Sequence, residues 1–190
     1  MPNWCENTLE IYGEEDKMKE FYDFFGGQDK FLDNFCFNNI LPLPQELDGT
    51  RSPSNIVSKE DYDRYTQLEK KHNIKDSQDV HRLVEDGTLT KEEQDLLWKE
   101  GITQEMSDMR KSEYGYDNWY DWQVHHWGTK WDIRGDCGND VIDDDHCTFI
   151  FQTAWSPPEP IVKKLQEMFP DLSICGGYVG EGWEYAGVFE

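Results

Sequence analysis

Aromatic and histidine side chains gather in one short segment of this sequence and offer the most binding chemistry. They are Trp119, Trp122, His125, His126, Trp127, Lys130 and Trp131. Indole rings stack on bases and other planar ligands, and histidine forms hydrogen bonds or carries a proton near neutral pH. The segment therefore predicts either a pocket for a nucleotide-like ligand or a set of core side chains between a helix and a sheet. Core packing is favoured, because aromatic rings dominate buried area.

Lys130 has two interpretations of its own. Its ammonium group either pairs with Asp121 or Asp132, or faces an anion in a pocket. The ion pair is favoured, because a partly buried lysine usually has an acidic partner.

A second group of candidate residues is acidic and lies in what reads as a loop between two strands. Its members are Asp136, Asp140, Asp143, Asp144 and Asp145. Carboxylates bind Ca²⁺ or Mg²⁺, but the regular Asp-x-Asp-x-Asp-Gly spacing is missing, so a solvated hairpin tip is favoured. We expect these residues to contact a protein partner.

Cysteine and histidine near the same loop raise the possibility of zinc. Cys137, His146 and Cys147 supply three ligands, whereas a tetrahedral structural site needs four, and no Cys-x-x-Cys pair occurs. We therefore expect no metal and no other cofactor.

Known catalytic signatures are missing from the sequence. We find no GxxxxGK[ST] phosphate loop, no GxSxG elbow and no HExxH motif. The glycine-rich stretch 176–182 precedes a predicted strand, so it lacks the helix N-terminus that would hold a phosphate. We expect a protein that is not an enzyme and has no catalytic residues, although a Cys/His dyad assembled in space stays open.

The charge is strongly negative. The 190 residues include 40 Asp and Glu against 18 Lys and Arg, a net charge of -22. Residues 1–50 and 111–190 hold most of the excess, with 11 acidic against 3 basic and 15 against 5. Direct binding to nucleic acid or to an anionic membrane is disfavoured, because phosphate contacts need Lys and Arg. A basic partner or plain solubility fits this charge.

The five cysteines are odd in number, and the polar residues after Met1 do not read as a signal peptide. Apolar runs are too short to span a membrane. Reduced thiols in a cytoplasm are the simplest expectation.

Hydrophobic periodicity and capping residues predict the elements that carry these groups. The first part of the chain predicts a strand at 7–12, a helix at 14–25 and an irregular stretch at 31–44 with room for a short strand. Helices follow at 59–71, 77–86 and 90–99, and a further helix begins at Asp117 or Asn118 and ends at Gly128. The last part predicts strands at 129–134 and 147–155, a helix that ends at Phe169, and a hairpin at 172–179 and 183–189.

This order predicts an α+β fold. It corresponds to a ferredoxin-like split β-α-β antiparallel sheet in a single domain over residues 1–190, interrupted by a helical insertion at about 51–110. Helices should cover one face of the sheet and leave the other free.

Three motifs also resemble a known family. They are Met1-Pro2-Asn3-Trp4-Cys5-Glu6-Asn7, Asn118-Trp119-Tyr120-Asp121-Trp122 with Trp127-Gly128-Thr129-Lys130-Trp131-Asp132, and Phe151-Gln152-Thr153-Ala154-Trp155-Ser156-Pro157-Pro158. The sequence resembles the YubB ferredoxin-like domain family of plasmid- and bacteriophage-encoded proteins. This resemblance implies a ferredoxin-like fold and a mobile-element origin, and it supplies no catalytic residues.

Two functions follow as hypotheses. The favoured one is an acidic protein in the cytoplasm of a bacterial host, whose DNA-mimic-like surface inhibits a basic host defence protein such as a nuclease, a restriction enzyme or a CRISPR component. The alternative is a small-ligand protein that binds or sequesters a nucleotide with its Trp/His-rich segment. An accessory protein without a specific ligand stays open, as does the oligomeric state.

Overall fold

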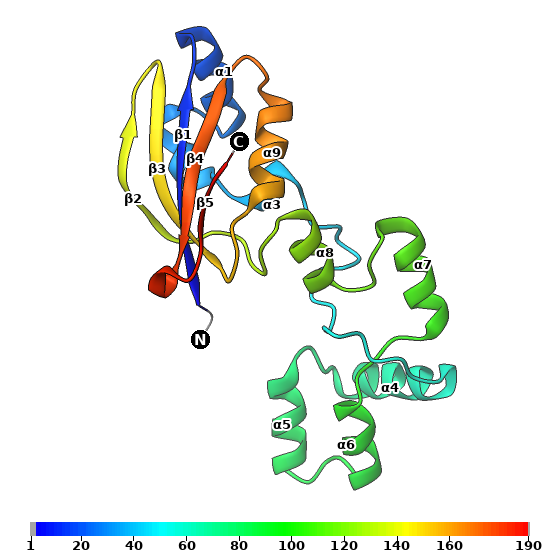
Figure 1. Cartoon of the computed structure of the whole chain (residues 1–190). Helices are drawn as coiled ribbons and strands as arrows, with labels where there is room; N and C mark the ends of the chain where they lie inside the picture. Colours follow the sequence, from blue (N-terminus) through cyan, green and yellow to red (C-terminus); the bar gives the residue numbers. More distant parts are fainter. Residues whose placement is uncertain (1–2, 190) are drawn as a thin grey trace. The chain divides into compact units, whose positions relative to one another are not determined.

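The chain folds into two compact units. The computed structural model describes residues 3–189, apart from the side chains of residues 134–140. Unit 1 holds the residues up to 43 and those from 123 onward, and unit 2 holds residues 44–122. The division falls within helix α8 (Trp119–His126). The insertion expected at 51–110 lies inside unit 2 (Figure 1).

Strand β1 (Trp4–Tyr12) is the central strand of unit 1. Its side chains alternate, so that Leu9 and Ile11 are fully buried while Glu6 and Tyr12 are exposed. This alternation is the pattern of a strand with one covered face. The strand pairs antiparallel with β3 (His146–Ala154) on one side and β4 (Ser173–Gly180) on the other.

The complete sheet has the order β2-β3-β1-β4-β5, with β2 (Arg134–Ile142) and β5 (Ala186–Phe189) at its edges. Along the chain, α1 (Glu15–Phe24) follows β1, and α9 (Glu159–Met168) connects β3 to β4. The first four strands with these two helices form the split β-α-β arrangement, and β5 extends it by one antiparallel strand. The predicted ferredoxin-like α+β fold is confirmed.

Helices α1 and α9 cover one face of this sheet (Figure 1). An aromatic cluster beneath them forms much of the core, and its rings meet edge-on or tilted at centroid distances such as 5.2 Å between Phe31 and Phe149. The cluster also includes Phe21, Phe25 and Phe35, which are buried.

The segment after α1 departs from its predicted form. Instead of a short strand, residues 28–40 form the 3₁₀ turn η1 (Gln28–Lys30) and the short helices α2 (Phe31–Asn34) and α3 (Phe37–Ile40). The carboxylate of Asp132 accepts hydrogen bonds from the backbone N–H groups of Phe37 (2.7 Å) and Asn38 (3.0 Å). This cap comes from a residue far along the chain, so local sequence patterns do not reveal it.

The acidic loop expected before β3 is also different. Strand β2 runs from Arg134 to Ile142, so only residues 143–145 remain as the turn. Register shifts lie on both sides of Gly138, and such irregularities let an edge strand rich in Gly and Asp pair with its neighbour.

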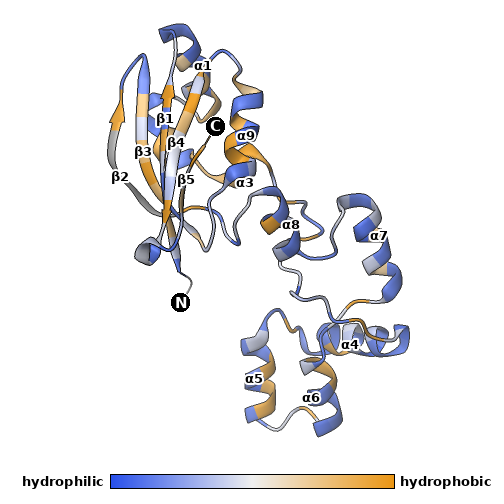
Figure 2. Ribbon diagram, viewed as in Figure 1, coloured by the Kyte–Doolittle hydropathy of each residue, from blue (hydrophilic) through white to orange (hydrophobic). Residues whose placement is uncertain are grey.

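Unit 2 is a set of small capped helices, α4 (Lys59–His72), α5 (Ser77–Glu85), α6 (Lys91–Trp98) and α7 (Gln104–Tyr114). Thr90 forms a complete capping box with Glu93, and the Ser58 side chain caps α4 by accepting from the Asp61 N–H. Val80, Leu89 and Leu97 form a small core, and Figure 2 shows hydrophobic residues on both α5 and α6. The first three helices agree with their predicted ranges, whereas α7 has no counterpart among the predicted elements.

Across the described residues 3–189, no helix has both the length and the apolar character to cross a membrane.

Candidate functional site

The backbone at the end of β3 holds a strained tryptophan. Trp155 has a φ of 71°, in the left-handed region that bulky residues rarely adopt. Such a conformation costs about 1–3 kcal/mol and persists only where neighbouring groups over-determine it. The Trp155 side chain is nevertheless 44% exposed. The strain therefore presents this ring at the surface and does not help to fill the core.

Side-chain hydroxyls hold three consecutive carbonyl groups around this position. The Trp155 carbonyl accepts from the Tyr185 hydroxyl at 2.7 Å. The flanking carbonyls accept from Thr129 Oγ1 (Ala154 O, 2.9 Å) and from Thr153 Oγ1 (Ser156 O, 2.7 Å). The Trp155 N–H donates to the Asn3 carbonyl at 2.9 Å. Every backbone polar group of Trp155 is thus bound, which fixes its unusual conformation.

The neighbouring turn requires glycine. Gly128 has a φ of 80°, and a Cβ there would lie 2.7 Å from Pro160 Cδ and 2.8 Å from the Pro157 carbonyl. Its carbonyl accepts from Ser156 Oγ at 2.6 Å. The Gly128 turn and the Trp155 segment are therefore locked together.

The buried side chain of Asn7 extends this network to β1. Its amide donates to Thr153 Oγ1 at 3.0 Å and to the Phe151 carbonyl at 3.3 Å. Parts of all three motifs that carry the family resemblance thus converge on one structural element of unit 1, although they are separated in sequence, whereas the Asn118–Trp122 part of the second motif belongs to unit 2. That element is the support of Trp155.

A cation lies over the exposed ring. Lys130 Nζ is 4.9 Å from the ring centroid of Trp155 and 4.5 Å from that of Trp131. The two indole rings are 6.4 Å apart at an interplanar angle of 30°. Both distances from the ammonium are within the range of a cation–π contact. Asp132, which follows Trp131, caps α3 with both of its oxygens.

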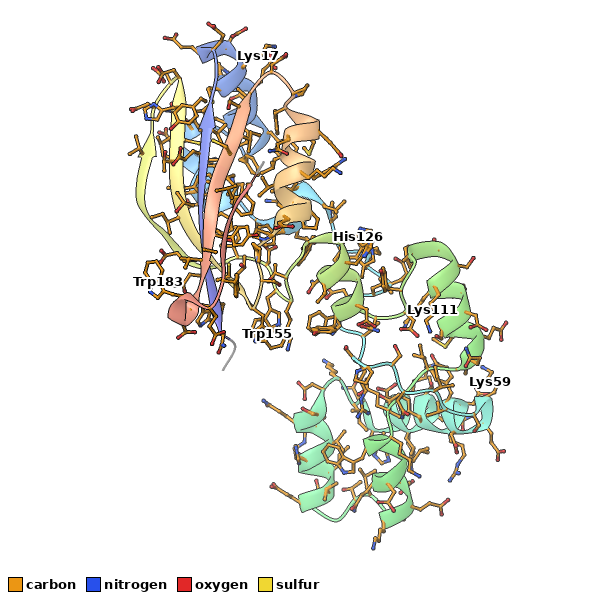
Figure 3. The ribbon with its side chains drawn as sticks, viewed as in Figure 1. Lys17, Lys59, Lys111, His126, Trp155 and Trp183 are labelled. Atoms are coloured by element: carbon orange, nitrogen blue, oxygen red, sulfur yellow. The ribbon has the colours of Figure 1, made fainter. Side chains whose placement is uncertain are left out.

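Two more exposed aromatics lie on the hairpin between β4 and β5. Trp183 is 86% exposed with a φ of 63°, and Tyr185 is 37% exposed. They lie on and just after the 3₁₀ turn η2 (Glu181–Trp183). A Cβ on Gly180 would lie 2.4 Å from the Tyr185 ring, so glycine lets this ring approach the strand. Figure 3 shows Trp155 and Trp183 at the same end of the sheet, where β1 begins. We call Trp131, Trp155, Trp183 and Tyr185 the aromatic end.

The Tyr185 hydroxyl remains a donor near neutral pH. Burial raises its pKa, and the hydrogen bond with Cys5 raises it further. Burial also raises the pKa of the Cys5 thiol. Both groups therefore stay protonated at neutral pH, and the hydrogen bond to Trp155 persists.

The predicted Trp/His segment is divided between the two units. Trp122, in unit 2, and Trp127, in unit 1, are almost completely buried. The Trp127 indole donates to the Leu41 carbonyl at 2.9 Å and packs against Phe37. These two rings are core side chains and offer no surface for stacking. Trp119, in unit 2, is half-buried, and its backbone N–H donates to Thr50 Oγ1.

The histidine pair belongs to unit 1. The rings of His125 and His126 are 4.9 Å apart and nearly perpendicular. Partial burial lowers the pKa of His126, and the neighbouring His125 lowers it further. His126 is therefore more strongly biased toward the neutral form than an ordinary histidine.

The predicted acidic residues form part of a turn. Asp143, Asp144 and Asp145 are exposed between β2 and β3, while the side chains of Asp136 and Asp140 lie outside the described residues. The Asp145 carboxylate is 3.1 Å from His146 Nδ1, and this hydrogen bond lowers the pKa of Asp145. Where side chains are described, no group of three or more His, Cys, Asp or Glu is placed to hold a metal ion.

Sequence reasoning missed Trp155, Trp183 and Tyr185 as site residues. A tryptophan directly after two turn glycines, as in Gly-Glu-Gly-Trp at residues 180–183, was an available signal of exposure. The left-handed backbone of Trp155 had no such signal.

Fold and site together define unit 1 as a ferredoxin-like α+β domain that presents aromatic side chains. Residues 126–190 match a family model described as the ferredoxin-like domain in Api92-like protein. The crystal structure of protein api92 from Yersinia pseudotuberculosis is similar at 14% sequence identity and a TM-score of 0.36, over 99% of this chain and 93% of that chain. No curated protein matches the chain.

Proposed function

We propose that this chain is an acidic interaction module that binds a basic protein, with the aromatic end as its anchor. The observation that carries this proposal is Trp155, whose ring is half-exposed although its backbone is strained. Four hydrogen bonds hold this conformation. Three are accepted by the carbonyl of Trp155 and the two adjacent carbonyls, and the fourth is donated by the Trp155 N–H. Strain that the surrounding structure maintains without benefit to the core is a sign of function.

The residue types of the aromatic end suit a protein interface. Tryptophan and tyrosine are enriched among the few residues that carry most binding energy, and truncation of such a residue commonly costs about 2 kcal/mol or more. Trp183 is the most exposed large hydrophobic side chain among the described residues. Trp155 and Tyr185 are exposed at the same end of unit 1, and clustered exposed apolar side chains commonly mark an interaction site.

Charge selects the kind of partner. Unit 1 contains 21 acidic and 7 basic residues, a net charge of -14, whereas unit 2 contains 19 and 11, a net charge of -8. The unit that carries the aromatic end is therefore also the more negative one. A basic protein surface would be attracted over a distance and then docked by the rings.

The finer form of the proposal concerns origin and target. The sequence motifs resemble YubB-type ferredoxin-like proteins of plasmids and bacteriophages, and such elements benefit from blocking host defence. The proposed partner is accordingly a nucleic-acid-binding defence protein of a bacterial host, such as a nuclease, a restriction enzyme or a CRISPR component. Carboxylates would occupy part of a cleft that otherwise binds DNA phosphates.

Competition with DNA tests this function. The full chain is titrated into complexes of DNA with a panel of purified bacterial nucleases, restriction enzymes and CRISPR complexes, at salt from about 50 to 500 mM. We expect displacement of DNA from at least one of them, with an affinity that falls as salt rises. The proposal is contradicted if the chain displaces DNA from no protein of the panel. It is also contradicted if the affinity of displacement does not change with salt.

Substitutions locate the anchor. Trp155→Ala and Trp183→Ala should each weaken displacement by about tenfold or more. Trp98→Ala removes an exposed tryptophan of unit 2 and should leave it unchanged. If Trp155→Ala and Trp98→Ala weaken displacement of DNA equally, the aromatic end is not the anchor. Heat release on titration with a nucleotide panel would favour the small-ligand alternative.

A further inference from the structure

The two indole rings and the lysine at the aromatic end have the geometry of an occupied cation site. We propose that the Trp131–Trp155 ring pair receives a guanidinium or alkylammonium group of the basic partner, and that Lys130 is a resident occupant which this group displaces. This inference rests on the proposed function and names the chemistry of its anchor.

The distances show that one cation reaches both rings. Lys130 Nζ lies 4.5 Å and 4.9 Å from the two ring centroids, inside the range of about 6 Å for a cation–π contact. The electrostatic preference of the ring pair for positive charge is thus already satisfied in the isolated chain. Another cation of the same kind can take this position.

The ring geometry is poorly suited to a sandwiched base. A flat ring between two indoles needs about 3.5 Å on each side, or about 7 Å between parallel planes. The centroids of Trp131 and Trp155 are 6.4 Å apart, and the planes are tilted by 30°. A compact or edge-inserted cation is compatible with this spacing.

Charge argues against an anion at Lys130. The lysine belongs to unit 1, whose net charge is -14, so an approaching anion is repelled by most of its surroundings. The same surroundings attract a cation. Arginine is the better competitor, because its guanidinium is less strongly hydrated than an ammonium and can enter between the rings by its edge.

Displacement is physically accessible. Trp155 is 44% exposed, so part of its ring is open to an incoming group. Lys130 is only half-buried and carries its charge on a flexible four-carbon stem that can turn toward water.

Fluorine NMR of the full chain labelled with 5-fluorotryptophan tests the site. Resonances of the two rings are identified from Trp131→Phe and Trp155→Phe. Titration with N-acetyl-arginine amide should move both resonances, while N-acetyl-citrulline amide, which is neutral and similar in shape, should not. No movement with the arginine compound, or equal movement with citrulline, overturns the inference.

Lys130→Ala provides a test of sign. Removal of the resident cation should tighten binding of N-acetyl-arginine amide about two- to fivefold, the energy of one exposed cation–π contact. Lys163→Ala removes the same charge from an exposed position on α9 and should change the affinity much less. Weaker binding in Lys130→Ala would show that the lysine belongs to the ligand contact and would overturn the inference.

Two further comparisons separate the alternatives. N-acetyl-arginine with a free carboxylate carries a negative group that this acidic unit should repel, so tighter binding of this compound than of N-acetyl-arginine amide would refute a protein side chain as the ligand. If Trp155→Ala abolishes displacement of DNA while capped arginine moves neither ring, the cation site is refuted and the proposed function stands.

Discussion

Replacement of Trp155 by glycine and by alanine isolates the strain at this position. Both substitutions remove the same indole ring, so they differ only by a Cβ on a backbone with a φ of 71°. At an ordinary position, glycine is less stable than alanine by about 0.4–1 kcal/mol, because it is more flexible in the unfolded chain. In the left-handed region, a Cβ costs about 1–2 kcal/mol. The order should therefore be inverted, with Trp155→Gly more stable than Trp155→Ala by about 1 kcal/mol.

Amide hydrogen exchange of β1 measures this difference without assuming that the two units unfold together. As the central strand, β1 reports the opening free energy of unit 1. Glu20→Gly and Glu20→Ala in the exposed middle of α1 are the matched control, where alanine should be more stable by about 1 kcal/mol. If the Trp155→Ala variant is at least as stable as the Trp155→Gly variant, the backbone of Trp155 is unstrained. This result would remove the main argument for the site.

Three other substitutions test the supporting structure. Gly176→Ala should destabilise unit 1 by about 3 kcal/mol or more, because its Cβ would lie 2.0 Å from the Thr8 carbonyl at a φ of 148°, and loss of β1 protection measures this. Trp127→Phe should cost about 1–3 kcal/mol through the lost bond to Leu41, with no effect on displacement of DNA. Asp117→Asn should destabilise unit 2 at pH 7 by about 1–3 kcal/mol and flatten its acid sensitivity, measured by exchange of α7 amides against pH.

The sign of the Asp117 effect follows from its surroundings. Burial alone would raise the pKa of this carboxyl, but hydrogen bonds from Ser107, Lys111 and Asn118 outweigh burial and hold the pKa well below its usual value. The stabilisation is therefore complete above the unfolded pKa of about 3.9 and is lost as pH falls below it toward the folded value. An Asp117→Asn variant with unchanged acid sensitivity would contradict this account.

Controls accompany the other two substitutions. Gly177→Ala, where the nearest atom lies 3.1 Å from the added Cβ, should be tolerated much better than Gly176→Ala. If Trp127→Phe impairs displacement of DNA as strongly as Trp155→Ala, the two tryptophans do not have the separate roles assigned to them here.

Much of the fold is encoded locally, and this part is predictable. The alternation in β1, the caps Ser58 and Thr90 and the proline-led start of α9 each depend on neighbours within a few residues. The short helices at 31–40 depend instead on Asp132, about a hundred residues away, so their form could not be deduced from local patterns.

Only part of the candidate site could be predicted from the sequence, because the rest depends on contacts between distant residues. Lys130 and Trp131 stood out by composition, and the structure places them with Trp155. Nothing in the sequence distinguishes a buried Trp127 from an exposed Trp155, because the distinction arises from the left-handed turn at the end of β3. Side-chain orientation of this kind is a tertiary property.

The hydroxyl that holds the Trp155 carbonyl belongs to Tyr185, near the end of the described residues, whereas the carbonyl that receives its N–H belongs to Asn3. During translation, Asn3 is therefore synthesised long before Tyr185. Tyr185 can dock only after β4 and the turn that follows it have been synthesised. A partner that recognises the fixed ring therefore discriminates against nascent and truncated chains, and engages only those whose ferredoxin-like unit is complete.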